Sequence, residues 1–218
     1  MQATMKTQTE LIKVSCGIGR SFEEAARAVT EAKKNKGKDD FNIKVYNGTR
    51  LRSKLPESFK QRVQEYLLLA KELSNDQIKI LENFTLKDPL TGLLNKTGFV
   101  LKLEELKQKG INEGYYILFD LDDLHDWNNK LGYNEVDRYI EMIGQAIKNN
   151  IRHGDFCSSD KRVADIVGHR LNESAGDEFL IFVPAEHNEK NVERLKVLAT
   201  RLLEKIYEKQ IEMKALKN

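Results

Sequence analysis

The stretch GYYILFDLDDLHDWNNKLGYNEVD, residues 114–137, decides the fold class of this chain. It opens with an apolar run whose length is typical of a buried strand. The run ends in a cluster of carboxylates at Asp120, Asp122 and Asp123. Because side chains alternate along a strand with period two, Asp120 and Asp122 could face the same way. Helical spacing over residues 123–150 follows, so the stretch predicts a mixed α/β domain with acidic groups at the end of a strand.

A second acidic pair, Asp177 and Glu178, lies at the turn of a predicted hairpin between residues 163–171 and 179–183. Acidic groups at two adjacent strand ends can hold Mg²⁺, which takes oxygen ligands and shares its shell with substrate phosphates. Two such metals bind both the attacking and the leaving oxygen of a phosphoryl transfer. The alternative is that these carboxylates are only solvated turn residues.

Composition excludes several classes of protein. The 218 residues carry 36 basic and 34 acidic side chains, a net charge of +2, which argues against nucleic acid or a membrane surface as a partner. No stretch approaches the roughly 18 apolar residues that a spanning helix needs. The N-terminus has no apolar signal core, so we expect a cytoplasmic protein. Cys16 and Cys157 make no disulfide framework and no metal-ligand cluster, and we interpret both as structural thiols.

The N-terminal region predicts a strand–helix–strand unit. LIKVSCGIG, residues 11–19, is typical of a strand that ends in glycines. A helix follows over residues 21–36, where Ser21 and Glu24 form a capping box whose side chains each satisfy a backbone donor. FNIKVYNG, residues 41–48, indicates a second strand closed by a turn.

A connector follows this unit. Residues 49–55 indicate a linker, and a heptad-like apolar stripe then runs over residues 56–84. A capping box at Ser74 and Gln77 predicts a break in this helix. The stripe suits either a helix packed on its own domain or a helix that pairs with a second subunit. A charged amphipathic helix over about 187–214 ends the chain.

Three segments resemble, in order, the signature blocks of GGDEF domains, the diguanylate cyclase family. DPLTGLLN, residues 88–95, is similar to the block D-x-L-T-G-L-x-N, and its Asn95 can cap the next helix. Residues 117–137 are similar to D-x-D-x-F-K-x-x-N-D-x-x-G-H-x-x-G-D, and AGDEFLIF, residues 175–182, to the signature turn. The resemblance implies an α/β (α+β) class and a palm-like cyclase fold, in which helices flank a central, mostly antiparallel sheet.

The resemblance also implies a circular permutation. Family members continue after the last helix of this chain with a strand, a helix and a final strand. IKVSCGIG, residues 12–19, resembles that strand, and residues 22–46 resemble the closing helix and strand, with Lys33 on the family's lysine. We therefore expect a single permuted domain over 1–218: residues 1–46 as the family's C-terminal unit, 47–87 as a helical connector and 88–218 as the signature-bearing core.

By the same resemblance, the acidic clusters would be catalytic. Asp120 and Asp177 would bind Mg²⁺ or Mn²⁺ through their carboxylates, and Leu121 would bind it through its backbone carbonyl. Glu178 would assist the metal or the attacking hydroxyl. Gly176 would let the backbone approach the nucleotide closely, because it has no Cβ.

Four further positions would bind substrate. Asn128 and Asp137 lie on the family's guanine-recognising positions, and an acceptor carboxylate can take the N1–H and N2–H of guanine, which favours GTP over ATP. Lys33 would neutralise the triphosphate, and His125 stands where the family has a phosphate-contacting lysine. Without the resemblance, Asn128, Asp137 and Lys33 also suit a helix cap, a solvated face and a helix C-terminal charge.

Other positions depart from the family pattern. Glu173 falls on the usual arginine near the phosphates, a charge reversal, and Ala175 replaces the first signature glycine with one extra methyl. These changes bear on triphosphate affinity and rate more than on metal binding. The family's inhibitory R-x-x-D motif, which binds cyclic di-GMP, is matched by Arg152 and Asp155, which align by the preceding helix, or by residues 162–165, which lie nearer the signature. Plain surface charges are the alternative for both.

The sequence leaves three functions open. The first is a diguanylate cyclase, in which two GTP molecules, one on each subunit of a homodimer, condense into cyclic di-GMP and pyrophosphate. The second is a catalytically degenerate module that binds GTP or cyclic di-GMP and acts through a partner. The third is a palm-type cyclase that makes a different cyclic or linear oligonucleotide.

Overall fold

The computed structural model describes residues 11–34, 42–48, 85–151, 166–169 and 178–215, and eight single residues between 61 and 82. The predicted linker, most of the heptad-like stripe and Cys157 lie outside the described residues. The elements are as follows: β1 Val14–Gly19, α1 Phe22–Lys34, β2 Asn42–Val45, α4 Lys96–Gln108, β3 Gly114–Leu121, α5 Leu124–Leu131, α6 Tyr133–Asn150, β4 Ile166–His169, β5 Glu178–Pro184 and α7 Glu189–Ala215.

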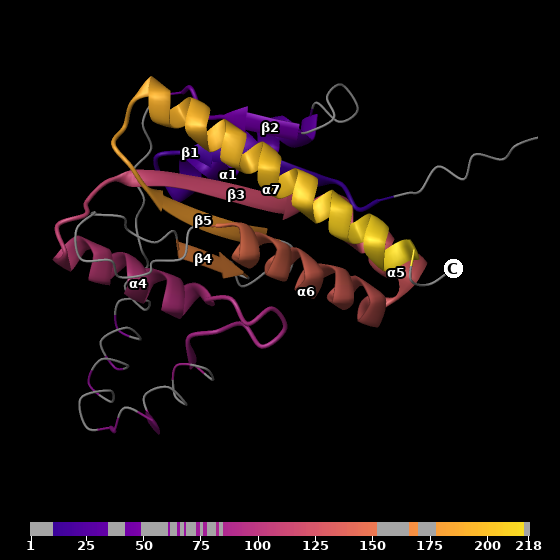
Figure 1. The fold of residues 1–218 in the computed structure, drawn as a ribbon, viewed down its shortest axis with the longest axis horizontal. Coiled ribbons are helices and arrows are strands. Elements are labelled where there is room, and N and C mark those ends of the chain that lie inside the picture. The colour runs from indigo at the N-terminus through magenta and orange to yellow at the C-terminus, as the bar shows by residue number, and fades with distance from the viewer. Residues whose placement is uncertain are drawn as a thin grey trace, which may run out of the picture.

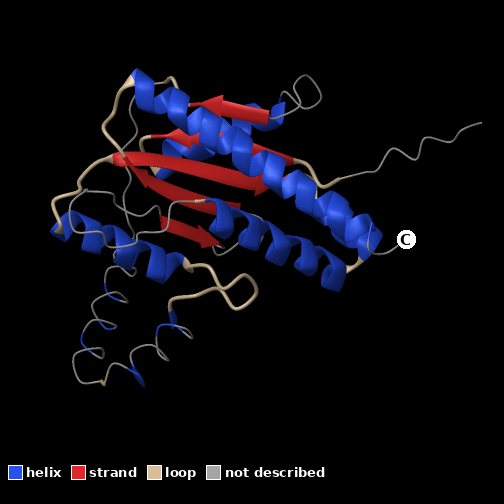
Figure 2. Cartoon of the chain, viewed as in Figure 1, coloured by secondary structure: helices blue, strands red, loops and turns tan. Residues whose placement is uncertain are grey.

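Five strands form one sheet in the order β2-β1-β3-β5-β4. β1 and β2 are parallel, whereas the pairs β1–β3, β3–β5 and β4–β5 are antiparallel. Helices cover both faces, with α6 and α7 side by side across one of them (Figures 1 and 2). The predicted mostly antiparallel sheet flanked by helices is therefore confirmed, as is the hairpin of β4 and β5.

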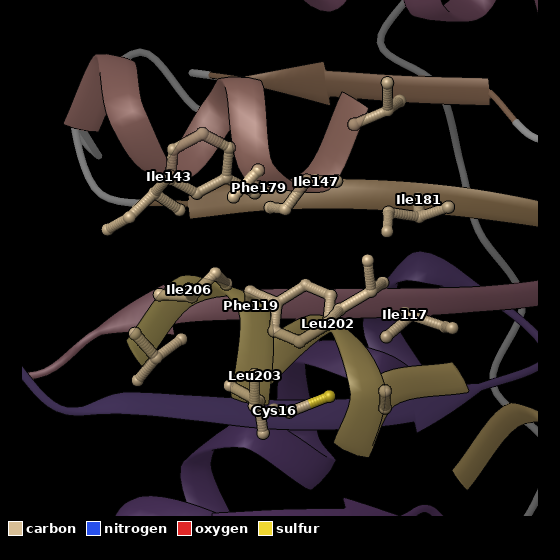
Figure 3. Packing of buried hydrophobic residues seen from close by; sticks show 14 of the residues in the cluster. Cys16, Ile117, Phe119, Ile143, Ile147, Phe179, Ile181, Leu202, Leu203 and Ile206 are labelled. Atoms are coloured by element: carbon tan, nitrogen blue, oxygen red, sulfur yellow. The ribbon is translucent and has the colours of Figure 1, made fainter. Parts of the chain in front are cut away.

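Alternation along β3 divides its side chains between two cores. Ile117, Phe119 and Leu121 belong to the larger core, while Leu118 packs with α1 and α4 on the opposite face. Figure 3 shows the larger core, in which strand residues meet residues of α6 and α7. The labelled members are Cys16, Ile117, Phe119, Phe179 and Ile181 from the sheet, and Ile143, Ile147, Leu202, Leu203 and Ile206 from the helices. Cys16 is fully buried, and burial raises the pKa of its thiol, which agrees with a structural role.

The predicted capping box at Ser74 and Gln77 forms, and the one at Ser21 and Glu24 forms in part. The Ser21 hydroxyl accepts from the Glu24 N–H at 3.2 Å, but the Glu24 carboxylate accepts from the N–H of Arg20 at 2.8 Å, one residue before the predicted donor. At the second box, the Gln77 amide oxygen accepts from the Ser74 N–H at 3.0 Å, which supports the predicted helix break.

Among the residues that the structure describes, no helix has the length and apolarity needed to cross a bilayer.

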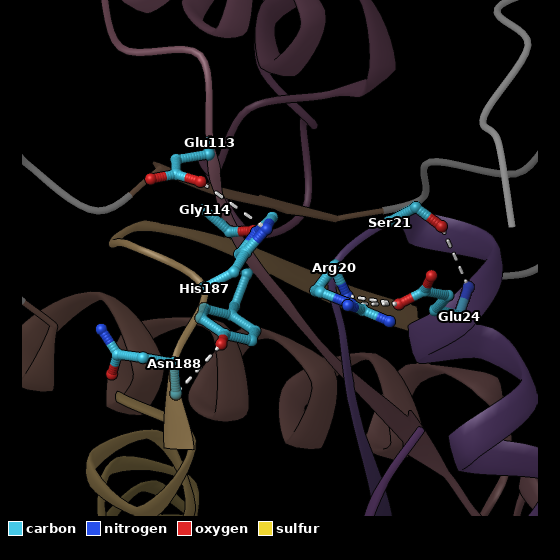
Figure 4. A network of polar contacts seen from close by, with 8 residues as sticks. Arg20, Ser21, Glu24, Glu113, Gly114, His187 and Asn188 are labelled. Carbon is cyan, nitrogen blue, oxygen red and sulfur yellow. Dashed lines mark hydrogen bonds and ion pairs between the residues drawn. The ribbon is translucent and has the colours of Figure 1, made fainter. Parts of the chain in front are cut away.

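Polar contacts close the end of the sheet where β3 begins (Figure 4). His187 donates through Nε2 to the carbonyl of Gly114 at 2.7 Å, and the Tyr115 hydroxyl donates to the carbonyl of Asn188 at 3.3 Å. These bonds tie the loop before α7 to the first residues of β3. The acidic cluster lies at the opposite end of β3.

Gly17 allows α1 to lie directly against β1. A Cβ at this position would come within 2.2 Å of the Ala25 carbonyl oxygen and 2.5 Å of the Val29 nitrogen, both of them backbone atoms of α1. We predict that Gly17→Ala lowers the free energy of unfolding by more than about 2 kcal/mol, because the helix must move away from the sheet. Urea denaturation measures this loss.

Gly144→Ala is the graded comparison for this prediction. Its added Cβ would meet only side-chain atoms, at 3.1 Å or more, and alanine also favours the helical conformation of α6. We expect a clearly smaller loss than for Gly17→Ala. Equal stability of the two variants would contradict the close approach of α1 and β1.

Candidate active site

Asp120 lies near the end of β3, the middle strand of the sheet. The strand register pairs it with Ser15 of β1 on one side and with Glu178 of β5 on the other. Directly opposed residues of antiparallel strands have Cβ atoms about 4.5–5.5 Å apart. The structure therefore brings together one member of each acidic cluster that the sequence singled out, and it buries Asp120 to 8% exposure.

Other predicted site residues lie outside the described residues. They are Asp177 and Gly176 of the signature turn, Arg152 and Asp155 of the candidate inhibitory motif, and Glu173 and Ala175. Their roles stay predictions.

Lys33 reaches Asp120 from the last turn of α1. Its Nζ forms an ion pair with Oδ1 of Asp120. The lysine side chain is 35% exposed, so its ammonium stands between the buried carboxylate and the solvent. The N-terminal unit thus delivers the cation that the resemblance assigned to the phosphates, although its action on a nucleotide remains a prediction.

The turn after β3 holds two more acidic residues. Asp122 is 2% exposed and accepts a hydrogen bond from Ser15, the residue opposite Asp120, so both carboxylates flank the same serine. Asp123 has φ of 59° and is the only non-glycine residue with positive φ in the described part of the chain. A left-handed conformation strains a residue that has a Cβ.

Helices α5 and α6 carry the predicted base-recognising residues. Asn128 of α5 and Asp137 of α6 are both half-buried, and the chain turns between the helices at Gly132, whose φ is 81°, as the predicted break requires. His125 is exposed, and its Nε2 lies 3.1 Å from the side-chain nitrogen of Asn129. The structure thus presents these residues on the two helices that directly follow the acidic turn.

The oxygen donors at the end of β3 suit a hard divalent cation. The Asp120 carboxylate and the Leu121 carbonyl are donors that Mg²⁺ and Mn²⁺ prefer. A cationic ammonium already contacts Asp120, so the electrostatics of the position favour positive charge. Within the described residues, no group of three or more His, Cys, Asp or Glu side chains could hold a metal ion. Asp177, the second carboxylate ligand that the family resemblance predicts, lies outside the described residues.

A buried histidine–aspartate pair, which the sequence did not reveal, lies at the end of β4 that leads into the turn of the hairpin. His169 of β4 has no exposure, and its Nδ1 lies 3.1 Å from Oδ1 of Asp88 in the DPLTGLLN loop. The ring also stacks on Phe179 at 4.4 Å between centroids. Burial alone would raise the pKa of Asp88, but hydrogen bonds from His169 and from the N–H and hydroxyl of Thr91 outweigh it and hold the pKa well below its usual range.

Asn95 caps α4 as predicted, accepting from the Gly98 N–H at 3.1 Å.

A model of the family described as diguanylate cyclase, GGDEF domain, matches residues 85–216. The chain belongs to the GGDEF domain family. The match includes β3, α5, α6 and the β4–β5 hairpin, and it excludes β1, α1 and β2. The structure nevertheless sets these three elements in the same sheet and beside the same carboxylate.

Two proteins resemble this GGDEF chain in sequence. It is 36% identical over 74 residues to the probable diguanylate cyclase DgcJ of Escherichia coli (strain K12), covering 33% of this chain and 15% of DgcJ. It is 26% identical over 121 residues to the uncharacterized membrane protein YdaK of Bacillus subtilis (strain 168), covering 53% of this chain and 38% of YdaK. The chain therefore spans less than half the length of these relatives.

Solved structures also resemble the GGDEF chain. Diguanylate cyclase SiaD of Pseudomonas aeruginosa, in complex with its activator SiaC, aligns with a TM-score of 0.40 at 21% identity, over 70% of this chain and 50% of that one. The GGDEF domain of DgcB from Caulobacter crescentus, in complex with c-di-GMP, aligns with a TM-score of 0.37 at 19% identity, over 52% and 60%.

The lowered pKa of Asp88 predicts a defined pH dependence of stability. The ionised carboxylate contributes stability in full above the unfolded-state pKa of about 3.9, and this contribution is lost as the pH falls through the lower folded-state pKa. We predict that Asp88→Asn lowers the free energy of unfolding by about 2 kcal/mol at pH 7. The difference from the wild type should stay constant down to about pH 5 and shrink below about pH 4.

Urea denaturation between pH 7 and pH 3 checks this profile. Asp126→Asn, which neutralises an exposed carboxylate on α5, is the control and should run parallel to the wild type. A difference between Asp88→Asn and the wild type that does not depend on pH would show that the carboxylate is not held in its charged form.

Proposed function

We propose that this GGDEF domain is a diguanylate cyclase that condenses two GTP molecules into cyclic di-GMP and two pyrophosphates. One observation carries the proposal. In a chain of this family, Asp120 at the end of β3 lies opposite Glu178 and in contact with Lys33, so acidic and basic groups suited to a metal-bound triphosphate converge at one point.

Each residue has a defined part in the proposed reaction. The 3′-hydroxyl of each GTP attacks the α-phosphorus of the other, a new P–O bond forms, and pyrophosphate leaves with its electron pair. Asp120, Asp177 and the carbonyl of Leu121 would hold Mg²⁺ or Mn²⁺, which supplies Lewis-acid polarisation of the phosphate and of the attacking hydroxyl. Glu178 accepts the hydroxyl proton or supports the metal, and Lys33 offsets the triphosphate charge.

Selectivity for GTP is assigned to α5, α6 and the signature turn. Asp137 can accept from the N1–H and N2–H of guanine, and Asn128 can donate to or accept from the same edge. His125 replaces a permanent cation with an imidazole, and we therefore expect weaker phosphate binding at this position. Gly176 leaves room for the nucleotide.

The proposal includes an assembly and its regulation. Since each active centre binds one GTP, the reaction needs a homodimer, at least transiently. Arg152 and Asp155 are proposed as a site at which the product, cyclic di-GMP, binds and inhibits. A cytoplasmic setting, where GTP is present, belongs to the same proposal.

A second candidate is a binding module that does not catalyse. The Lys33 ammonium contacts an Asp120 oxygen that a metal would need, and this pairing favours a chain that binds nucleotide without a complete metal centre. The two candidates differ in product and not in fold.

Incubation with GTP or ATP and either Mg²⁺ or Mn²⁺, followed by mass spectrometry, tests both candidates. We expect cyclic di-GMP from GTP alone. Nucleotide binding without any product would reject the cyclase in favour of the module. A linear product would reject the proposal that the chain makes a cyclic dinucleotide. A product that contains adenine would reject the assignment of guanine recognition to Asn128 and Asp137.

Two variants test the residues at the end of β3. Asp120→Asn should reduce turnover to background, because it removes a charged metal ligand, whereas Asp126→Asn should leave turnover unchanged.

Lys33→Met should weaken GTP binding about tenfold, since hydrogen bonds to charged groups are worth about 1.5 kcal/mol or more. Its neighbour Lys34 is exposed, and Lys34→Met is the matched control. Equal GTP dissociation constants for the two lysine variants would contradict the role of Lys33.

We further propose that residues 1–218 form one circularly permuted domain with the divisions predicted from the sequence. The ends of the permuted segments support this. Gln210, near the end of α7, donates to the carbonyl of Ile12 at 3.0 Å and accepts from its N–H at 2.8 Å, just before β1. A chain that ran from α7 directly into β1 would therefore need only a short connection.

Moving the N-terminal unit tests the permutation. A variant that begins at residue 85 and carries residues 11–48 after Ala215, through a short flexible linker, should unfold cooperatively. A variant that begins at residue 85 and lacks this unit should not, because β1 supplies Val14, Cys16 and Ile18 to the core. Thermal unfolding by circular dichroism distinguishes the two, and cooperative unfolding of the shorter chain would contradict the single domain.

A further inference from the structure

Ser15 joins three elements through a buried hydroxyl. The side-chain amide of Asn42, in β2, donates to Ser15 Oγ at 2.9 Å. Ser15 Oγ, in β1, lies 3.0 and 3.1 Å from the two carboxylate oxygens of Asp122, just after β3. An amide nitrogen only donates, so Ser15 Oγ accepts from Asn42 and its own hydroxyl hydrogen is left to donate to Asp122. The direction of both hydrogen bonds is thereby fixed, from β2 through β1 to the end of β3.

Asp122, which accepts the hydrogen bond from Ser15, begins a strained turn. The N–H of Asp122 donates to the carbonyl of Lys13 at 2.8 Å, which extends the β1–β3 ladder beyond Leu121. Asp123 then adopts φ of 59° and starts α5 without a side-chain cap. A strained backbone persists only where its surroundings hold it. The backbone and the side chain of Asp122 are both hydrogen-bonded to β1 or the residue before it, so Asp122 holds the chain in place on one side of Asp123.

Asp120 and Asp122 are satisfied in different ways. Asp120 pairs with the ammonium of Lys33, whose side chain is 35% exposed. Asp122 accepts from the neutral hydroxyl of Ser15 inside the protein, and it also lies near Tyr207 of α7. Burial raises the pKa of Tyr207, and the Asp122 carboxylate raises it further, whereas the hydrogen bond from the Val14 N–H lowers it. Asp122 is therefore suited to anchor the turn.

We infer that Ser15 and Asn42 are positioning residues that fix the β3–α5 turn, and with it the orientation of α5 relative to the end of β3. Neither residue belongs to the matched GGDEF segment, residues 85–216. The functional meaning rests on the proposed function, since α5 carries Asn128 and the end of β3 carries Asp120. The geometry of the turn can be tested without nucleotide.

Trp127 is a built-in reporter for the turn. It is the only tryptophan of the chain and lies on α5, four residues after Asp123. Its ring lies 5.4 Å from Nζ of Lys130, which is on α5 itself, and 5.9 Å from Nζ of Lys214 on α7, so a shift of α5 against α7 changes its distance from the Lys214 ammonium. Fluorescence emission and acrylamide quenching of Trp127 therefore respond to a change in the position of α5 relative to α7.

Ser15→Ala and Asn42→Leu test the inference in the full chain. We expect each variant to remain folded, to shift Trp127 emission and quenching, and to weaken GTP binding about tenfold. Ser15→Thr keeps the hydroxyl and should restore Trp127 emission toward the wild type. Ser21→Ala removes another buried serine hydroxyl that makes a hydrogen bond, at the far end of β1, and should lower stability without changing Trp127.

The outcomes separate the inference from the proposed function. Wild-type Trp127 emission and quenching in folded Ser15→Ala and Asn42→Leu would overturn the inference, whatever the chain synthesises. If Ser15→Ala does not fold, Asn42→Leu, at a half-buried position of the edge strand, decides alone. A changed Trp127 signal in a protein that makes no cyclic di-GMP would support the turn and reject the cyclase.

Discussion

The antiparallel register between β1 and β3 is the constraint on which the rest of the structure depends. It pairs Val14 with Leu121 and continues to Gly19 opposite Tyr116. This register sets Ser15 beside Asp120 and inserts Cys16 and Ile18 into the larger core. It also carries α1 across the sheet. A shift by one residue would turn every one of these side chains to the other face, so one pairing determines both the core and the acidic site.

Local elements could be predicted from the sequence because their signals are short-range. The buried strand before Asp120, the capping boxes and the break at Gly132 each depend on residues within a few positions of one another. The GGDEF blocks added the family, and through it the pairing of the two acidic clusters. The partners of buried polar groups could not be predicted in this way. Ser15 and Asp122 are separated by 107 positions, and a buried histidine such as His169 leaves no periodic pattern.

Two buried carboxylates at the end of β3, Asp120 and Asp122, are stabilised by different partners. A buried carboxylate needs a partner that compensates for its lost hydration. Asp122 accepts from the buried hydroxyl of Ser15, whereas Asp120, 8% exposed, pairs with the partly exposed ammonium of Lys33. Both donors come from the N-terminal unit, outside the matched family segment. The signature residues therefore depend on elements that a comparison limited to the GGDEF match would leave out.

The contact between Gly17 and α1 has a consequence for how substitutions would be interpreted. The backbone of α1 is fixed against β1 along its first two turns, while Lys33 lies in the last turn, beside Asp120. The contact at Gly17 therefore sets the tilt of α1, and the far end of the same helix sets the position of the Lys33 ammonium beside Asp120. A small tilt of α1 at Gly17 would become a larger displacement of the ammonium. A change at Gly17 would thus look like a defect in charge at a site that it never touches.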